Sequence, residues 1–186
     1  MMRTIPSLVV IFALAASAGG QTNATTPTVY ELVQGSTYQT GCFPRGACPV
    51  MSETPVEGMF RLAFTGADPL FSHYAITEVK WLVRIGEQEI LITGAGTYKT
   101  GGEFALTHQL ELDLAVGGNA PQHFDSGTVP GGGSFPKIDI VISIHGMQCL
   151  DTVIHVIAAP LGEVTPKLPR HANFVLNPRE SRYEIS

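Results

Sequence analysis

The sequence has little positive charge, and nothing in it gathers that charge into a binding surface. Its 186 residues include 11 Lys and Arg against 16 Asp and Glu, a formal net charge of −5. No basic stripe and no interleaving of basic with aromatic residues is present, so the electrostatic footprint of a nucleic-acid-binding protein is missing. We therefore expect no nucleic-acid partner. The mildly acidic balance indicates solubility and does not point to a particular partner.

Signature motifs of catalysis are missing as well. The sequence has no His-Glu-x-x-His zinc motif, no Gly-x-Ser-x-Gly nucleophile elbow, no Walker phosphate loop and no Gly-x-Gly-x-x-Gly dinucleotide motif. Each of these patterns places a specific chemical group at a defined position on a helix or turn, so their absence favours a protein outside the enzyme classes that they mark. We expect no cofactor and no catalysis.

Only one long apolar run occurs, near the N-terminus. Residues 8–16 are preceded by Arg3 and followed by the small-residue site Ala16-Ser17-Ala18, an order typical of a secretory signal peptide. The run is shorter than the ~20 residues of a membrane-spanning helix, and no later run is longer. We expect a secreted or periplasmic protein without a stable membrane anchor. The predicted segments are a signal peptide over 1–18, a flexible leader over 19–27, a β domain over 28–160 and a Pro-containing C-terminal tail over 161–186.

No long stretch carries the 3.6-residue period of an amphipathic helix, whereas alternation with period two is frequent. It is clearest over 104–116, where every second residue is apolar or histidine, and it recurs over 60–64, 79–85, 90–98 and 138–144. The segment CLDTVIHVIAA is apolar on both faces, which is typical of a central strand. Short strands joined by Gly-containing turns predict one all-β domain: an antiparallel β-sandwich or barrel, built as a meander of about seven to nine strands.

Cysteine is scarce, and its three copies are unevenly placed. Cys42 and Cys48 flank a Pro-Arg-Gly tip, and Cys149 lies about a hundred residues further on. In an exported protein disulfides are the default, and three cysteines permit one bridge. We expect the bridge to join the loop to Cys149, with Cys48 ranked before Cys42, because it would staple a loop with few apolar residues onto the sheet. A local Cys42–Cys48 bridge is the alternative. A zinc site is not expected, because it requires closer cysteine spacing and a fourth ligand.

One degenerate catalytic motif surrounds Asp125. Phe124-Asp125-Ser126-Gly127 matches the Asp-Ser/Thr-Gly core of aspartic proteases, a chemistry that needs two carboxylates sharing a proton. The only similar segment, 150–153, has Val153 where the motif has glycine. The alternative interpretation is a turn in which Asp125 binds its own backbone. If the segment is extended, His123 and Asp125 share a face and are candidate ligand residues, but no metal is predicted because no spacing supplies further ligands.

Aromatic side chains offer a second kind of candidate. Tyr30, Tyr38, Tyr74, Trp81 and Tyr98 either pack the core or line a ligand cavity, since a filled sandwich and a hollow barrel produce the same alternation. Trp81 is in phase with its apolar neighbours and is predicted to point inward in either case.

Two further features of the predicted β domain are a histidine on a strand and a glycine-rich segment. His108 lies on the apolar face of the strongest alternating segment, where a core histidine with satisfied nitrogens is expected. The Gly131–Ser134 stretch, GGGS, predicts a flexible loop.

Several segments together carry a family resemblance: GSTYQTGCFPRGACPV, DPLFSHYAITEVKW, GAGTYKTGGEFAL and FDSG…FPKIDIVIS. They resemble a group of secreted bacterial all-β proteins with a GCF…CPV cysteine loop and no known activity. The resemblance implies export and nothing chemical. Length and meander are also similar to lipocalins, but the lipocalin Gly-x-Trp is replaced by Gly58-Met59-Phe60.

Three functions follow from these observations. The first is a secreted, non-catalytic binding or structural β module whose partner is an extracellular protein or a small ligand. The second is a lipocalin-like carrier of a small apolar ligand, and the third is an aspartic-type hydrolase using Asp125. A cavity of about 300 Å³ or more inside the domain would favour the carrier, and a filled core would favour the module.

Overall fold

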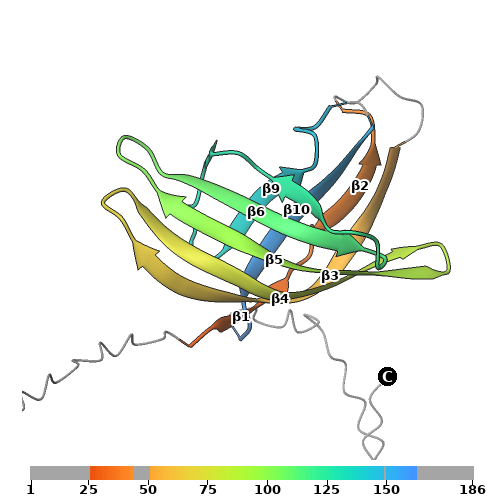
Figure 1. Ribbon diagram of the computed structural model, residues 1–186, viewed down its shortest axis with the longest axis horizontal. Coiled ribbons are helices and arrows are strands. Elements are labelled where there is room, and N and C mark those ends of the chain that lie inside the picture. Colours follow the sequence, from red (N-terminus) through yellow and green to blue (C-terminus); the bar gives the residue numbers. More distant parts are fainter. Residues whose placement is uncertain (1–25, 44–50, 149, 163–186) are drawn as a thin grey trace, which may run out of the picture.

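The computed structural model describes residues 26–43, 51–148 and 150–162, and the regular elements in these ranges are all β-strands (Figure 1). The strands are β1 (Thr28–Leu32), β2 (Thr37–Gly41), β3 (Met51–Ala67), β4 (Phe71–Ile85), β5 (Gln88–Gly101), β6 (Thr107–Val116), β7 (Gln122–Asp125), β8 (Val129–Pro130), β9 (Ile138–Ser143) and β10 (Asp151–Pro160). They form one antiparallel sheet. The prediction of an all-β meander is confirmed.

The sheet closes on itself into a ring. Successive strands from β3 to β7 pair with their neighbours, β9 pairs with β10, and β1 and β2 each pair with both β10 and β3. β1 and β2 therefore share one position, as do β7 and β8 against β6, so the ten strands occupy eight positions around the ring. The junction of β7 with β9 is the shortest, a single residue pair, Asp125 with Ser143. Of the two predicted architectures, the structure has the closed one.

A serine hydroxyl bridges each of the two interrupted positions. Between β1 and β2, the Ser36 hydroxyl accepts a hydrogen bond from the Ile157 N–H (3.1 Å) and donates to the Ile157 carbonyl (2.9 Å). Between β7 and β8, the Ser126 hydroxyl accepts from the Leu110 N–H (3.0 Å). A buried backbone N–H or C=O group without a hydrogen-bond partner lowers stability. These serine side chains supply the partners for backbone groups at the points where the strand bends away.

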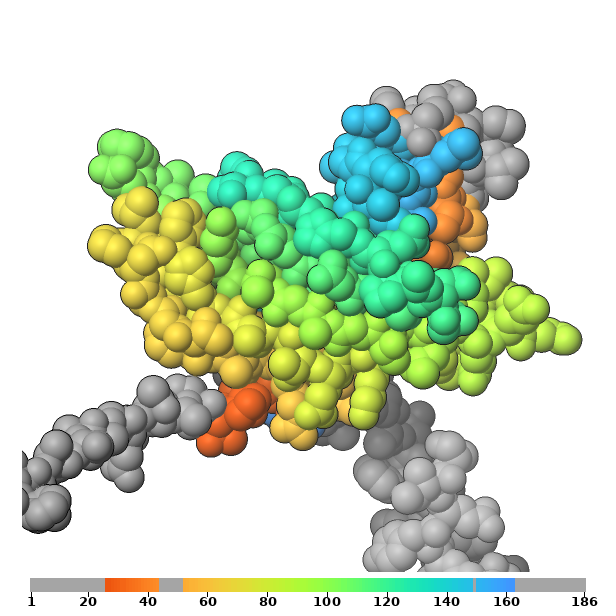
Figure 2. Space-filling model, in the orientation of Figure 1, coloured from red at the N-terminus to blue at the C-terminus, as the bar shows by residue number. Residues whose placement is uncertain are grey.

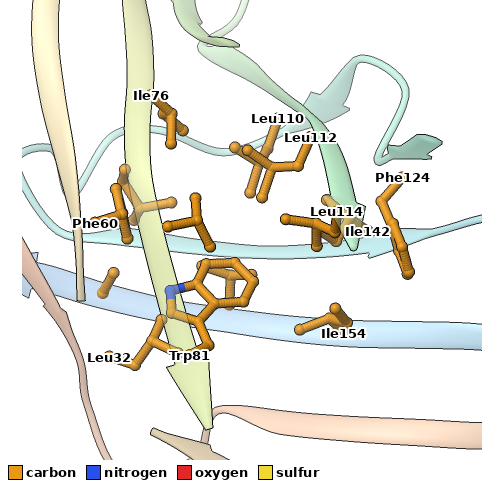
Figure 3. Packing of buried hydrophobic residues seen from close by; sticks show 14 of the residues in the cluster. Leu32, Phe60, Ile76, Trp81, Leu110, Leu112, Leu114, Phe124, Ile142 and Ile154 are labelled. Carbon is orange, nitrogen blue, oxygen red and sulfur yellow. The ribbon is translucent and has the colours of Figure 1, made fainter. Parts of the chain in front are cut away.

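The interior of the ring is filled with side chains. Every second residue of the strands points inward, and the inward set surrounds Trp81, which is 1% exposed. Figure 3 shows Phe60 and Leu32 on one side of the Trp81 indole and Leu114 and Ile142 on the other. The space bounded by Phe60, Trp81 and their neighbours on β4, β6, β9 and β10 is too narrow to hold a water molecule. Such a core matches the prediction that Trp81 points inward.

The clearest alternating segment is shorter in the structure than the sequence predicts. β6 begins at Thr107 instead of Phe104, and Phe104 is 95% exposed. The Gly102 N–H donates to the Leu70 carbonyl (2.9 Å), which ties the β5–β6 tip to the β3–β4 tip before pairing of β6 begins. Leu70, Phe104 and Leu106 are thus exposed at the hairpin tips that project on the left of Figures 1 and 2.

The turn between β9 and β10 is built around a buried carboxylate. The sequence predicts a tight hairpin at His145-Gly146, and Gly146 does adopt a positive φ of 67°, but the turn is longer than a two-residue hairpin. The Asp151 side chain is fully buried and accepts hydrogen bonds from four described backbone N–H groups, those of Ile144 (3.2 Å), His145 (3.0 Å), Met147 (2.7 Å) and Thr152 (2.7 Å). This carboxylate therefore replaces the missing hairpin bonds.

Replacing Trp81 tests the packing of the core. Its indole Nε1 is buried and has no hydrogen-bond partner among the described residues. We expect Trp81→Phe to cost about 1–2 kcal/mol, because it loses volume but removes an unsatisfied donor, and Trp81→Ala to cost about 3–5 kcal/mol. Urea unfolding followed by far-ultraviolet circular dichroism measures both, since the variants lack the only tryptophan. A cost for Trp81→Phe well above about 2 kcal/mol would contradict this expectation, because it would indicate that the indole N–H loses a partner.

Replacing Asp151 tests the turn. Asp151→Asn turns one oxygen into a donor that faces backbone N–H groups, and we expect a loss of about 1.5–3 kcal/mol in the free energy of unfolding. The matched control is Asp139→Asn, whose half-exposed carboxylate pairs with His155 (2.8 Å) and whose loss should cost less than about 1 kcal/mol. Chemical denaturation of both variants gives the comparison. A loss for Asp151→Asn no larger than the control's would contradict the role of the carboxylate.

Candidate functional site

The two candidate ligand residues on β7 lie on the outer face of the ring. β7 is extended, so His123 and Asp125 point outward while Phe124 between them is buried. Their partners differ: His123 Nδ1 lies 2.9 Å from Asp113 Oδ1, and this hydrogen bond is the largest cause of a raised pKa of His123. Among the described residues no three His, Cys, Asp or Glu side chains gather as a metal site.

Asp125 forms the turn that the sequence suggests. Its Oδ1 accepts hydrogen bonds from the Gly127 N–H (2.8 Å) and from Gln109 Nε2 (3.0 Å), so the prediction of an Asx turn is confirmed. The second carboxylate considered for an aspartic-type mechanism, Asp151, is committed to the backbone of the β9–β10 turn. Both carboxylates thus accept backbone N–H groups, and no hydrogen bond joins Asp125 to Asp151 in the described part of the chain.

The cysteine loop lies only partly within the described residues. Cys42 is buried and directly follows β2. Cys48 and Cys149 lie outside the described ranges. The residues next to two of the cysteines are in contact, because the Phe43 N–H donates to the Gln148 carbonyl (3.3 Å) and Gly41 pairs with Asp151.

An aromatic hollow of about 350 Å³ lies where β1, β3 and β4 meet the loop that precedes β9. Four aromatic residues line it, Tyr30, Phe64, Tyr74 and Phe135, together with two threonines, one leucine and two prolines. No charged side chain is in the lining. The volume lies within the range of small-molecule pockets in proteins.

One wall of the aromatic hollow is the segment Gly131–Lys137, called the plug loop below. The Gly131 N–H donates to the Leu106 carbonyl (3.1 Å), and two turns within the loop join Phe135 to Gly132 (3.2 Å) and Lys137 to Ser134 (2.9 Å). The loop lies so close to the sheet that a Cβ on Gly132 would come within 2.3 Å of the Thr100 hydroxyl. The sequence predicts a flexible loop here, whereas the structure packs it against inward-facing side chains.

Phe135 is the side chain by which the plug loop contacts the core. Its ring stacks on Tyr98 with an interplanar angle of 13° and lies 5.2 Å from the Tyr74 ring, centroid to centroid. Tyr74 in turn contacts Phe64, with 5.6 Å between ring centroids. The rings of Phe64, Tyr74, Phe135 and Tyr98 thus form one cluster that runs from the aromatic hollow into the core. Phe135 lies next to the hollow, and Tyr98 lies deeper.

A buried polar pair lies on the far side of Phe135. Tyr98 Oη lies 3.2 Å from His108 Nδ1, and His108 is only 4% exposed. Burial is the main cause of the lowered pKa of His108, and burial also raises the pKa of Tyr98 to about 12. The imidazole is therefore neutral and the phenol protonated near neutral pH. The sequence predicted a core histidine with both nitrogens satisfied, but Nε2 has no hydrogen-bond partner among the described residues.

A second hollow, also of about 350 Å³, lies on the outer face of β3–β6 and is polar. Its polar groups already contact one another or neighbouring groups: His73 binds Asp68 (2.7 Å), and Gln109 bridges the carboxylates of Glu111 and Asp125. Lys99 Nζ lies over the Phe71 ring, 5.3 Å from its centroid. A ligand here would have to displace these contacts, so the aromatic hollow is the better candidate site.

The sequence identified part of this candidate site. Tyr30 and Tyr74 were expected to line a cavity or pack the core, and both line the aromatic hollow. Phe64 and Phe135 were not singled out. A signal for Phe135 existed, because an aromatic residue between Gly133-Ser134 and Pro136 is unusual in a polar loop, but it does not reveal which surface the ring contacts.

The comparisons with known proteins identify no relative. No protein-family model, no curated protein and no solved structure matches the chain. Within the described ranges there is also no helix long and apolar enough to cross a membrane.

Proposed function

We propose that the protein is an exported, non-catalytic binding module whose ligand site is the aromatic hollow. The observation that carries this proposal is an uncharged hollow of about 350 Å³ walled by four aromatic residues at the surface of an otherwise filled ring. Ligand pockets commonly range from about 300 to 1,000 Å³ and are mainly apolar. The proposed ligand is neutral and flat, because aromatic walls favour stacking and no side chain in the lining would neutralise a charge.

The filled interior supports a module over a lipocalin-like carrier. A carrier of that kind holds its ligand inside the ring, where this protein has Trp81 and its neighbours with no room for water. A small apolar ligand would therefore bind in the aromatic hollow at the surface and not inside the ring. The hydrolase alternative has less support, because Asp125 and Asp151 bind backbone N–H groups.

Export and a disulfide belong to the same proposal. The N-terminal order of Arg3, an apolar run and Ala16-Ser17-Ala18 supports secretion to an oxidising space. We propose the bridge Cys42–Cys149, because the contact of Phe43 with Gln148 and the pairing of Gly41 with Asp151 bring together the chain segments beside these two cysteines. This ranks Cys42 ahead of Cys48. A bridge closing about a hundred residues contributes up to about 4.7 kcal/mol in the chain-entropy estimate.

Peptide mapping without reduction tests the bridge. We expect a Cys42–Cys149 peptide and one thiol, on Cys48, that reacts with a thiol reagent after unfolding. Cys48→Ser should leave the free energy of unfolding within about 0.5 kcal/mol of the native value, whereas Cys42→Ser should lower it by about 2–5 kcal/mol. Recovery of a Cys42–Cys48 or a Cys48–Cys149 peptide would reject the pairing.

Fragment binding followed by nuclear magnetic resonance tests the site. We expect benzamide to shift backbone amide resonances of β1 and of Gly131–Lys137, and benzoate, its anionic counterpart, to shift them less at equal concentration. Thr28→Phe places a ring into the hollow and should abolish the shifts. The control Val29→Phe changes the opposite face of the same strand and should preserve them. Shifts that are equal in both variants, or that map to other strands, would count against the aromatic hollow.

A further inference from the structure

The plug loop is attached to the rest of the ring by few bonds. Among the described residues, its backbone is tied to the sheet through the Gly131 N–H to the Leu106 carbonyl, and the other backbone bonds of the segment are internal turns. A further attachment is the ring of Phe135, which packs against the adjoining rings of Tyr74 and Tyr98. Removal of this one side chain therefore takes away the aromatic contacts that hold the loop against the sheet.

The place of Phe135, called the slot below, is a stacking position beside a pair of tyrosines. The Phe135 ring is nearly parallel to Tyr98, with an interplanar angle of 13° and 6.2 Å between centroids, and lies 5.2 Å from Tyr74; the two tyrosine rings are 6.0 Å apart, so they adjoin each other on one side of Phe135. The slot adjoins the aromatic hollow, since its occupant Phe135 and its neighbour Tyr74 both line the hollow. A flat ligand entering through the hollow would find the same stacking partners that Phe135 has.

A hydrogen-bonding atom of His108 faces the plug loop. His108 Nδ1 is engaged by the Tyr98 hydroxyl, whereas no described residue hydrogen-bonds to Nε2. A Cβ built on Gly131 would lie 2.6 Å from this Nε2, so the nitrogen faces the backbone of the plug loop. If the loop moves away, His108 Nε2 becomes the one polar group of His108 that is presented to the slot.

We propose that Phe135 occupies the place of a planar aromatic ligand, and that His108 Nε2 forms a hydrogen bond to a hydroxyl or amine at the edge of that ligand. The inference rests on the proposed function in that the aromatic hollow is the entrance. It adds a ligand class, phenol-like or aniline-like compounds, and a specificity-determining residue. The plug loop then competes with the ligand for the slot, and binding affinity is reduced by the fraction of molecules in which the loop is closed.

The matched probes are phenol and toluene, which have the same size and differ by a hydroxyl in place of a methyl group. Phe135→Ala empties the slot, and we expect it to raise the affinity for phenol about tenfold over the native protein because the competing ring is gone. In this variant phenol should bind at least as tightly as toluene. The control Phe104→Ala removes an exposed ring at the β5–β6 tip, outside the aromatic hollow, and should leave both affinities unchanged.

The role of His108 is tested in the same background. In the double variant Phe135→Ala/His108→Leu the phenol hydroxyl has no hydrogen-bond partner. Toluene should then bind about tenfold more tightly than phenol, which reverses the preference expected for Phe135→Ala alone. A second measurement does not depend on folding of that double variant. In Phe135→Ala, the ¹⁵N resonance of His108 Nε2 should shift on addition of phenol and stay in place on addition of toluene.

The outcomes separate this inference from the proposed function. If benzamide binds the native hollow but Phe135→Ala does not tighten phenol binding, the slot is wrong and the hollow stands. If Phe135→Ala binds phenol more tightly but the His108 Nε2 resonance does not move, the proposed hydrogen bond to His108 is wrong. If neither the native protein nor Phe135→Ala binds any of these probes, both proposals fail.

Discussion

Closure of the sheet is the constraint on which the rest of the structure depends. An open antiparallel sheet would leave two edges of unpaired backbone groups, whereas the ring gives most strands a neighbour on both sides. Closure requires the first strands to pair with the last one, and β1 and β2 each pair with β10 on one side and β3 on the other, with a break in the chain between them. The hydroxyls of Ser36 and Ser126 satisfy backbone groups at the two breaks, so the ring bends without leaving its hydrogen bonds unmade.

A ring of this size determines where a ligand can bind. Eight positions enclose a space that side chains can fill, and here Trp81 and the residues around it fill it. Binding surfaces are then confined to the outer face and to the place where the chain folds back over the inward-facing residues. The plug loop is such a place, because it brings Phe135 to the tyrosines without becoming part of the sheet. The hollow is thus a consequence of incomplete coverage by this loop, and its walls belong to β1, β3 and β4 as much as to the loop.

Features with a local cause were predicted from the sequence, and features with a distant cause were not. Period-two alternation reports burial directly, so it predicted β9, most of β6 and the inward orientation of Trp81. The Asx turn at Asp125 was predictable because its partner is two residues away. The same reasoning failed at Phe104, because the tie between Gly102 and Leu70 ends the hairpin early. It also did not find Phe135, whose contacts with Tyr74 and Tyr98 come from strands far along the chain.

The break at Ser36 divides one strand position into two five-residue strands that differ in how many of their residues are paired. β1 is joined to β10 by three residue pairs and to β3 by four, whereas β2 has five pairs on each side. Local opening of a protein follows such differences, and a short terminal strand opens at lower free energy than the elements it leaves behind. β1 also carries Tyr30 and Leu32, which are buried in the core, and Tyr30 stacks on Phe60. Opening of β1 would therefore disturb one wall of the aromatic hollow and the core of the ring together.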